Sequence, residues 1–366
     1  MSGRIGPARI GPARIGYYVH HHGRGHTNRA RQIIAHLNCP VTVFSSSPHV
    51  REPWDGTSVT VVELPLDVDK SKPVVQDWPE VLHYAPLGVP GVRERMILLA
   101  RWAAETNPRL LIVDVSVEIA LFARLLGVPT VIARQSGRRT DPPHRAAYQS
   151  CSALLAPYAE VLEEPDTPDW IREKTFYAGG FSRYARRSLS PREARRQLEI
   201  TVNQPLVVVM SGWGGSGNPL ATIAQAARRC PAWQWWVVGP APETIVQLPA
   251  NVNLVGAVTD TFPYLVAADV VVGSAGNNTV MEVATAGTPY VCIPEARPFG
   301  EQLSKAEAVA RTGGALVLPR WPDPEQWPDL LDRAKDLDAQ ALTKLVDADG
   351  AKKAARFIER IAAKYQ

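Results

Sequence analysis

One segment, residues 269–302, constrains the fold and the chemistry of this chain more than any other. It begins with a short apolar run, continues through Ser-Ala-Gly-Asn into a helical pattern that carries Glu282, and ends with a Gly-Thr-Pro stop, a second apolar run and the pair Glu301-Gln302. A strand that ends in small residues at a helix N-terminus favours an anion, because the free amides and the helix dipole both attract a phosphate. Glu282 lies about two helical turns further on, where its carboxylate can reach a ribose. The segment therefore predicts a nucleotide-diphosphate ligand.

Short apolar runs alternate with helical patterns along the rest of the chain, and this alternation occurs twice. Strands that are apolar throughout favour parallel sheets covered on both faces. The pattern therefore predicts an α/β protein with two doubly wound, Rossmann-like domains that face a cleft. Strands are expected at residues 15–20, 41–45, 59–64, 110–114, 130–134, 153–156, 206–210, 234–238, 252–255, 270–273, 290–293 and 315–318. Helices are expected at residues 28–37, 92–105, 118–126, 219–229, 279–286 and 302–311.

A polar, arginine-rich stretch between Gly179 and Pro191 marks the expected junction of the two domains. Ser190, Pro191 and Glu193 also have the pattern of a capped helix start. The expected divisions are a flexible tail at 1–14, an N-terminal domain at 15–182, a linker at 183–190, a C-terminal domain at 191–349 and a C-terminal amphipathic helix at 350–366.

A glycine-containing loop follows the first expected strand of each domain. Glycine at such a place lets the backbone approach a ligand closely. The N-terminal loop places His26 at a helix start, and the positive end of a helix favours the neutral imidazole that a general base needs. The C-terminal loop at 211–219 lacks the Gly-Lys-Ser/Thr ending of an ATP-binding P-loop. The residues expected to approach ligands are Gly23, Arg24 and Gly25 in the first loop and Gly214, Gly215 and Ser216 in the second.

The overall charge and the cysteine content limit the kinds of ligand and the cellular compartment that are expected for this chain. A net charge of +4 is too small to indicate nucleic-acid binding and is compatible with an anionic substrate. The four cysteines are far apart in the sequence, which favours reduced thiols and a cytoplasmic location. No cofactor is expected. No metal site is expected either, because consecutive histidines such as 20–22 point to alternating faces of a strand, and the Asp67-Val-Asp69 pattern lies in a polar loop.

These features resemble the two-domain GT-B glycosyltransferases, and family 28 most of all. The resemblance is closest over about residues 205–318 and weaker over 20–37 and 127–137. It implies an inverting, metal-independent transfer of a hexose or an N-acetylhexosamine from a nucleotide-diphospho-sugar, with UDP as the expected nucleotide, to an acceptor hydroxyl. The N-terminal domain would then bind the acceptor, whose identity is open, and the C-terminal domain the donor. A peripheral contact with a membrane surface is also left open.

The resemblance carries roles to individual positions. It implies that Glu282 binds the ribose hydroxyls, that Glu301 and Gln302 hold the donor sugar, and that His26 deprotonates the acceptor. The other donor-side residues are Arg183 at the domain junction, Val258 beside the nucleobase of the donor, and Ser274, Ala275, Gly276 and Asn277 at the diphosphate turn. Arg183 follows Gly179 at the spacing of the family's interdomain motif, but the Gly-Asn-Pro core of that motif is replaced here by Gly179-Gly180-Phe181.

Two alternatives use the same fold. A nucleotide-sugar epimerase or hydrolase needs further acid or base residues, for which Asp114 and Glu118 are the candidates. A non-catalytic nucleotide-binding subunit predicts UDP binding without turnover. If His26 is not the general base that deprotonates the acceptor, Asp114 and Glu118 are the next candidates for that role.

Overall fold

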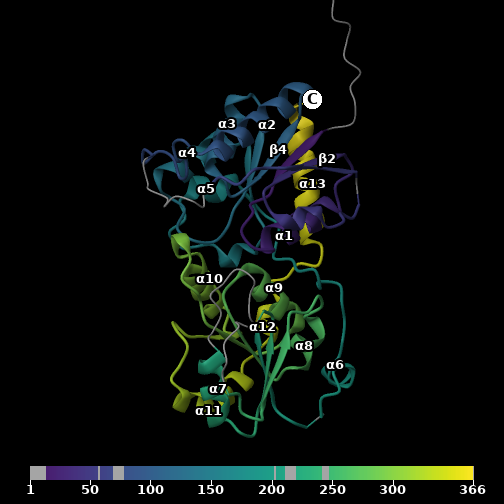
Figure 1. Cartoon of the computed structure of the whole chain (residues 1–366), viewed down its shortest axis with the longest axis vertical. Helices are drawn as coiled ribbons and strands as arrows, with labels where there is room; N and C mark the ends of the chain where they lie inside the picture. The colour runs from purple at the N-terminus through teal and green to yellow at the C-terminus, as the bar shows by residue number, and fades with distance from the viewer. Residues whose placement is uncertain are drawn as a thin grey trace, which may run out of the picture.

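The computed structural model describes residues 14–56, 58–68, 78–201, 203–210, 220–240 and 247–365. The expected tail at 1–14 therefore lies, except for Arg14, outside the described residues. The chain forms two α/β domains, one above the other in Figure 1. Every strand pair in both sheets is parallel. The predicted fold class is confirmed.

The N-terminal domain is built on a sheet with the strand order β3-β2-β1-β4-β5-β6-β7. Its strands are β1 (Ile15–Tyr18), β2 (Val41–Ser45), β3 (Val59–Glu63), β4 (Leu110–Asp114), β5 (Thr130–Ala133), β6 (Ala153–Ala156) and β7 (Thr175–Tyr177). Its helices are α1 (Gly25–Ile34), η1 (Pro48–Arg51), α2 (Pro90–Thr106), α3 (Val117–Leu125), α4 (Pro142–Ser150), η2 (Glu160–Leu162) and α5 (Asp169–Lys174).

The C-terminal domain has a sheet with the order β10-β9-β8-β11-β12-β13. Its strands are β8 (Leu206–Met210), β9 (Gln234–Val238), β10 (Val252–Gly256), β11 (Val270–Gly273), β12 (Tyr290–Cys292) and β13 (Ala315–Val317). Its helices are α6 (Pro191–Gln197), α7 (Leu220–Arg229), α8 (Phe262–Ala267), α9 (Asn277–Ala286), η3 (Pro298–Gly300), α10 (Glu301–Ala310), η4 (Pro324–Gln326), α11 (Trp327–Lys335) and α12 (Gln340–Thr343). The chain ends in α13 (Gly350–Ala362) and η5 (Ala363–Tyr365).

The apolar strands are buried because each sheet is covered on both faces. Alternate residues of one strand enter different cores: Tyr17 packs with Ile112 on one face of the N-terminal sheet, and Tyr18 packs with Val113 on the other. This two-residue alternation is the geometry of a strand. Strands of this kind are apolar at every position, which explains why the sequence shows continuous runs.

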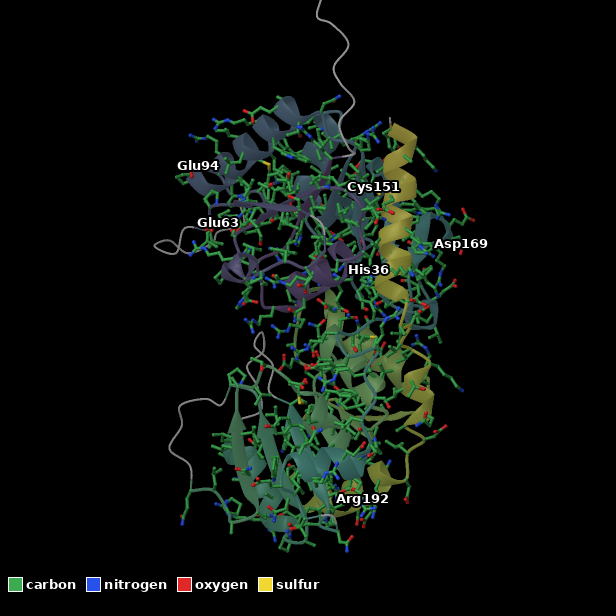
Figure 2. All side chains as sticks on the ribbon, turned by 90° about the vertical axis from the view of Figure 1, so that its right-hand side faces the viewer. His36, Glu63, Glu94, Cys151, Asp169 and Arg192 are labelled. Carbon is green, nitrogen blue, oxygen red and sulfur yellow. The ribbon has the colours of Figure 1, made fainter. Side chains whose placement is uncertain are left out.

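The C-terminal helix α13 returns to the N-terminal domain. Figure 2 shows it lying along that domain. The ring of Phe357 stacks on Phe176, with centroids 4.5 Å apart, and Ala354 and Ile358 enter the same core. The apolar face of the amphipathic helix expected at 350–366 is thus buried against the N-terminal domain.

The chain crosses between the domains at two adjacent places. At the first crossing, Phe181 still packs in the N-terminal core, whereas Tyr184 already packs in the C-terminal core. The amide of Gly180 donates to the carbonyl of Leu345 at 3.1 Å, and the amide of Asp347 donates to the carbonyl of Gly180 at 2.5 Å. The two crossings are therefore joined by backbone hydrogen bonds. No helix in the described part of the chain combines the length and apolarity that crossing a bilayer requires.

Candidate active site

The expected functional loops lie where the strand order of each sheet reverses. In the N-terminal sheet this point lies between β1 and β4, where the 20–24 loop follows β1 and Asp114 ends β4. In the C-terminal sheet it lies between β8 and β11, and the 274–276 turn follows β11. Open α/β sheets bind ligands beyond the carboxyl ends of their strands at such points.

Helices α1 and α9 begin opposite each other at the domain boundary (Figure 1). A Cβ atom added at Gly25, the first residue of α1, would lie 3.6 Å from Nδ2 of Asn278 in the first turn of α9. The N-terminus of a helix carries a partial positive charge. Two such ends meet at the domain boundary, so this boundary favours an anion.

His26 follows Gly25 in the first turn of α1 and is oriented by Asp114. Its Nδ1 atom is 2.9 Å from Oδ2 of Asp114, and its Nε2 atom is 3.3 Å from Nε2 of Gln135. A carboxylate accepts hydrogen bonds only, so the pairing with Asp114 favours a proton on Nδ1 and a lone pair on Nε2. Arg29 donates to the other carboxylate oxygen of Asp114, and its Nη2 atom also lies 3.0 Å from Nδ1 of His26. The contact with Asp114 thus favours the tautomer that can accept a proton at Nε2.

Asp114 stays ionised although it is completely buried. Burial acts to raise the pKa of its carboxyl group, but the charge of Arg29 and the ring of His26 outweigh burial and lower this pKa to about 2. Neighbouring His20 behaves differently, since burial lowers its pKa to about 2 and keeps its ring neutral. Asp114 is therefore a fixed anion beside His26 rather than a proton acceptor of its own.

The turn between β11 and α9 leads into the helix start that lies next to Gly25. The hydroxyl of Tyr290 donates to the carbonyl of Ser274 at 2.6 Å and so anchors the start of the turn. Gly276 is the N-cap residue of α9 and offers no side-chain acceptor to the amides of the first turn. A serine caps α3 and α6, by contrast. The amides at the start of α9 therefore have no cap from their own N-cap residue, as an anion-binding helix end requires.

Glu282 is buried in α9 and already has partners. Its carboxylate accepts from Nε of Arg183 at 3.0 Å and from the hydroxyl of Thr261 at 2.9 Å. Arg183 also donates to the carbonyl of Thr259 at 2.8 Å, and its guanidinium lies 4.6 Å from the ring centroid of Tyr184. Burial raises the pKa of Glu282, and Arg183 opposes that shift. Two predicted donor residues thus contact each other directly.

The predicted sugar-binding pair lies at the start of α10. Oε1 of Gln302 accepts from the amide of Glu295 at 2.9 Å, which fixes the buried side chain. The carboxylate of Glu301 lies 3.7 Å from Nη2 of Arg139 in the N-terminal domain. Both residues therefore lie at the carboxyl end of the C-terminal sheet, close to the domain boundary.

Phe299 connects this pair to the N-terminal domain. Its φ of 61° is in the left-handed region, which is unusual for a bulky residue and marks a strained position. The ring contacts His83 and His144, with centroids 5.2 and 4.9 Å apart, and the Arg139 guanidinium lies 4.8 Å from its centroid. Its carbonyl accepts from the amide of Arg138 at 3.1 Å. Strain of this kind persists where the surroundings hold it, and here they belong to the other domain.

Two of the remaining predicted site residues lie in the loop after β1, and a third lies between β10 and α8. Gly23 adopts a φ of 66° in the turn after β1, and Arg24 contacts His49 and Glu52 within its own domain. Val258 packs at the edge of the C-terminal core. Gly214, Gly215 and Ser216 lie outside the described residues.

Glu118, which the sequence offered as an alternative base, accepts from the amides of His83 and Tyr84 at 2.6 and 2.8 Å. The structure also adds residues that the sequence did not suggest. Thr261 and Gln135 are new contacts of Glu282 and His26, and no local pattern marks them. Asp114 was visible as a polar residue ending a buried strand, and its pairing with His26 follows from the adjacency of β1 and β4.

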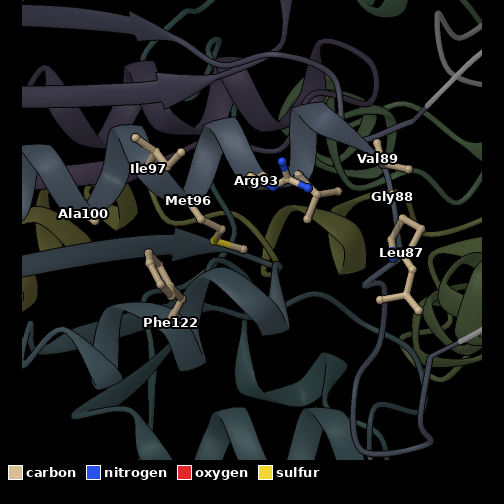
Figure 3. A pocket seen from close by; sticks show the side chains of 10 residues that line it. Leu87, Gly88, Val89, Arg93, Met96, Ile97, Ala100 and Phe122 are labelled. Carbon is tan, nitrogen blue, oxygen red and sulfur yellow. The ribbon is translucent and has the colours of Figure 1, made fainter.

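An apolar groove of about 400 Å³ lies on the N-terminal domain between α2 and α3 (Figure 3). Met96, Ile97 and Phe122 line it together with the exposed side chain of Leu87. The loop that contributes Leu87 also contains His83, whose ring contacts Phe299 at the domain boundary. One loop therefore connects the groove to the domain boundary.

The chain is similar in sequence to known glycosyltransferases. The profile of the glycosyltransferase family 28 C-terminal domain matches residues 247–360. An uncharacterised glycosyltransferase of Methanosarcina acetivorans is 25% identical over 213 residues, which cover 56% of this chain and 53% of that protein. The UDP-N-acetylglucosamine–N-acetylmuramyl-(pentapeptide) pyrophosphoryl-undecaprenol N-acetylglucosamine transferase of Thermus thermophilus is 27% identical over 253 residues, 65% of this chain and 68% of that protein.

A solved structure extends the likeness in fold to both domains. The glycotransferase of kitacinnamycin superposes with a TM-score of 0.70 at 18% identity, and the match covers 96% of this chain and 100% of the other. The sequence likeness is narrower: the chain spans about half the length of the Methanosarcina relatives that it matches.

Proposed function

We propose that this chain, which has the GT-B fold, is a glycosyltransferase of family 28 that moves a hexose or an N-acetylhexosamine from a UDP-sugar to an acceptor hydroxyl with inversion at the anomeric carbon. One observation carries the proposal. The oriented base His26 and the uncapped start of α9 lie at the reversal points of two different sheets, and the two helix starts meet where Gly25 approaches Asn278.

The base step follows from the geometry around His26. Nε2 takes the proton of the acceptor hydroxyl as its oxygen attacks the anomeric carbon. Asp114 accepts a hydrogen bond from Nδ1 and stabilises the imidazolium that forms. The bond from the anomeric carbon to the diphosphate breaks, and its electron pair leaves with the diphosphate. The proton on Nε2 is later released to solvent.

The leaving diphosphate needs compensation for its growing negative charge. The amides at the start of α9 and the guanidinium of Arg183 supply fixed positive charge on the donor side. Removing one such donor in comparable sites costs about 3 kcal/mol of barrier. We assign the ribose hydroxyls to Glu282, and the sugar hydroxyls to Glu301 and Gln302.

The choice of UDP is supported by the relatives, since the Thermus protein carries UDP-N-acetylglucosamine in its name. The acceptor side belongs to the N-terminal domain. The groove between α2 and α3 offers an apolar surface next to the loop at the domain boundary, where an apolar part of the acceptor or a membrane surface would make contact. The cytoplasmic location expected from the thiols stays a prediction.

The donor is tested by thermal shift with UDP-, TDP-, GDP- and ADP-sugars, because ligand binding raises the melting temperature according to ligand excess over its dissociation constant. Stabilisation by UDP-sugars above the others is expected. No shift with any of them would overturn the proposal. Product analysis with and without a lipophilic alcohol acceptor then separates transfer from hydrolysis, and NMR of the product reports whether the anomeric configuration is inverted.

A further inference from the structure

A buried lysine lies at the entrance of the proposed diphosphate site, and neither the sequence patterns nor the comparisons assign it a role. Lys305 is one helical turn after Glu301 on α10, and only 2% of its surface is exposed. Its Nζ atom donates to Oδ1 of Asn277, the first residue of α9, at 2.6 Å. Lysine is seldom buried to this degree unless its charge has a partner.

Lys305 has no direct ion-pair partner among the residues that the structure describes. No carboxylate of those residues lies within ion-pair distance of Nζ, and its hydrogen-bond partner is the neutral amide of Asn277. The ammonium also lies at the start of a helix, where the dipole repels a cation. A bound anion at this turn would remove both penalties at once.

The ionisable groups that face Lys305 come from several elements. Burial lowers the pKa of Lys305 to about 8; Glu301 on its own helix and Glu164 after η2 raise it, and Arg29 on α1 lowers it. The ring of Tyr158, which follows β6, lies 5.8 Å from Nζ. The ammonium is therefore held between both domains and loses its proton more readily than an exposed lysine does.

We propose that Lys305 is a positioning residue for the donor diphosphate, which fixes Asn277 at the start of α9 and supplies positive charge to the phosphates bound there. This inference rests on the proposed function, because it assumes that the turn at 274–277 holds a diphosphate. It adds a cation from α10 to the helix amides and to Arg183.

Two consequences distinguish this role from simple packing. First, UDP should gain affinity from Lys305, whereas uridine, which has the same base and ribose but no phosphate, should not. Second, a bound diphosphate favours the protonated lysine. At pH 8 Lys305 is deprotonated in part of the free protein, so UDP binding should be accompanied by uptake of a fraction of a proton by Lys305. At pH 6.5 Lys305 is already protonated, so this uptake should be close to zero.

The test is calorimetry on the full chain with UDP in two buffers of different ionisation enthalpy, with uridine measured by competition. Lys305→Met should weaken UDP binding about ten- to hundredfold, the loss of a hydrogen bond to a charged group. It should leave uridine unchanged and abolish the extra proton uptake at pH 8. Lys305→Arg should restore most of the UDP affinity. Lys335→Met, which removes an exposed lysine on α11, is the matched control and should behave as the parent protein.

The outcomes separate the two levels of the argument. If the parent protein binds no UDP, the proposed function fails. If it binds UDP, but Lys305→Met binds UDP as tightly and with the same proton uptake, only the role of Lys305 is overturned. If Lys305→Met does not fold, the inference is tested on the parent protein and on Lys305→Arg. It is contradicted if UDP binding by the parent protein takes up no proton in a pH-dependent way. It is also contradicted if Lys305→Arg binds UDP much more weakly than the parent protein does.

Discussion

Arg183 and Glu282 form an ion pair, with Nε and Oε1 3.0 Å apart, that joins the first domain crossing to the body of α9. Glu282 is the residue assigned to the ribose, and the pair shows that its carboxylate is held in place before any ligand arrives. Thr261 occupies its second oxygen. A carboxylate fixed in this way loses little conformational freedom on binding, which favours affinity.

The ribose assignment predicts the effect of Glu282→Gln. The amide keeps an oxygen for Thr261 but loses the charge-assisted bonds that a carboxylate makes, so UDP should bind about tenfold more weakly. Calorimetry with UDP and with UDP-sugars measures this directly. Unchanged affinity for both would remove Glu282 from the donor site. Glu307→Gln, on α10, is a matched control at an exposed position.

Replacing Arg183 by methionine should make stability depend more strongly on pH. Burial already raises the pKa of Glu282, and loss of Arg183 raises it further. A carboxyl group whose pKa is higher in the folded state contributes most below its unfolded pKa, and that contribution is lost as the pH rises through the folded value. The variant should therefore be close to the parent protein at pH 4.5 and lose on the order of 1–3 kcal/mol at pH 8. Chemical denaturation at the two pH values tests this, and an equal loss at both would contradict it.

His26 and Asp114 should act as a unit. His26→Ala removes the proposed base and should lower the transfer rate about 10²- to 10⁴-fold with little change in UDP affinity. Asp114→Asn should also slow transfer, because an asparagine amide can donate to Nδ1 and favours the wrong tautomer. Initial rates with saturating donor measure both effects. His36→Gln, an exposed histidine labelled in Figure 2, is the control. A rate that barely falls in His26→Ala would exclude it as the base.

Contact between the domains should matter for transfer more than for nucleotide binding. A Cβ atom at Gly137 would lie 2.9 Å from the carbonyl oxygen of Phe299 and 3.1 Å from Cα of Glu301. Gly137→Ala should therefore displace the start of α10 and slow transfer about tenfold, since a small misplacement at a reacting centre costs rate steeply, while UDP affinity changes little.

The control for this variant isolates backbone strain from the contact. Gly313 also has a positive φ, of 77°, but an added Cβ there meets no atom within 4 Å. Gly313→Ala should lose stability through strain alone, about 1–2 kcal/mol, and should keep its transfer rate. Equal rates in the two variants would show that the contact at Phe299 is unimportant.

The two-domain α/β architecture could be predicted from the sequence because the residue patterns that indicate strands and helix starts lie within short segments. Buried parallel strands such as β4 and β11 are continuous apolar runs, and the capping box at Ser190 marks the start of α6 directly. Short elements such as β7 and α8 lack such a signal and were not predicted. Their formation depends on packing against neighbours that are distant in the chain.

The candidate site was predictable only in part for the same reason. Residues on the β11–α9 segment are close in sequence, so one pattern identifies them together. Lys305 reaches Asn277 from a different helix, and Gln135 reaches His26 from a different strand end. Such pairs depend on the angle between elements and on domain contact, and neither is encoded within a short window.

The return of α13 to the N-terminal domain determines how this protein can be taken apart. Removing residues 350–365 would expose the face of Phe176 against which Phe357 stacks, so the N-terminal domain includes α13 as well as residues before the first crossing. The C-terminal domain, in contrast, is one uninterrupted stretch between two adjacent crossings. A chimaera that exchanges the C-terminal domain should therefore be made as an internal cassette. A graft that also included α13 would replace part of the N-terminal domain.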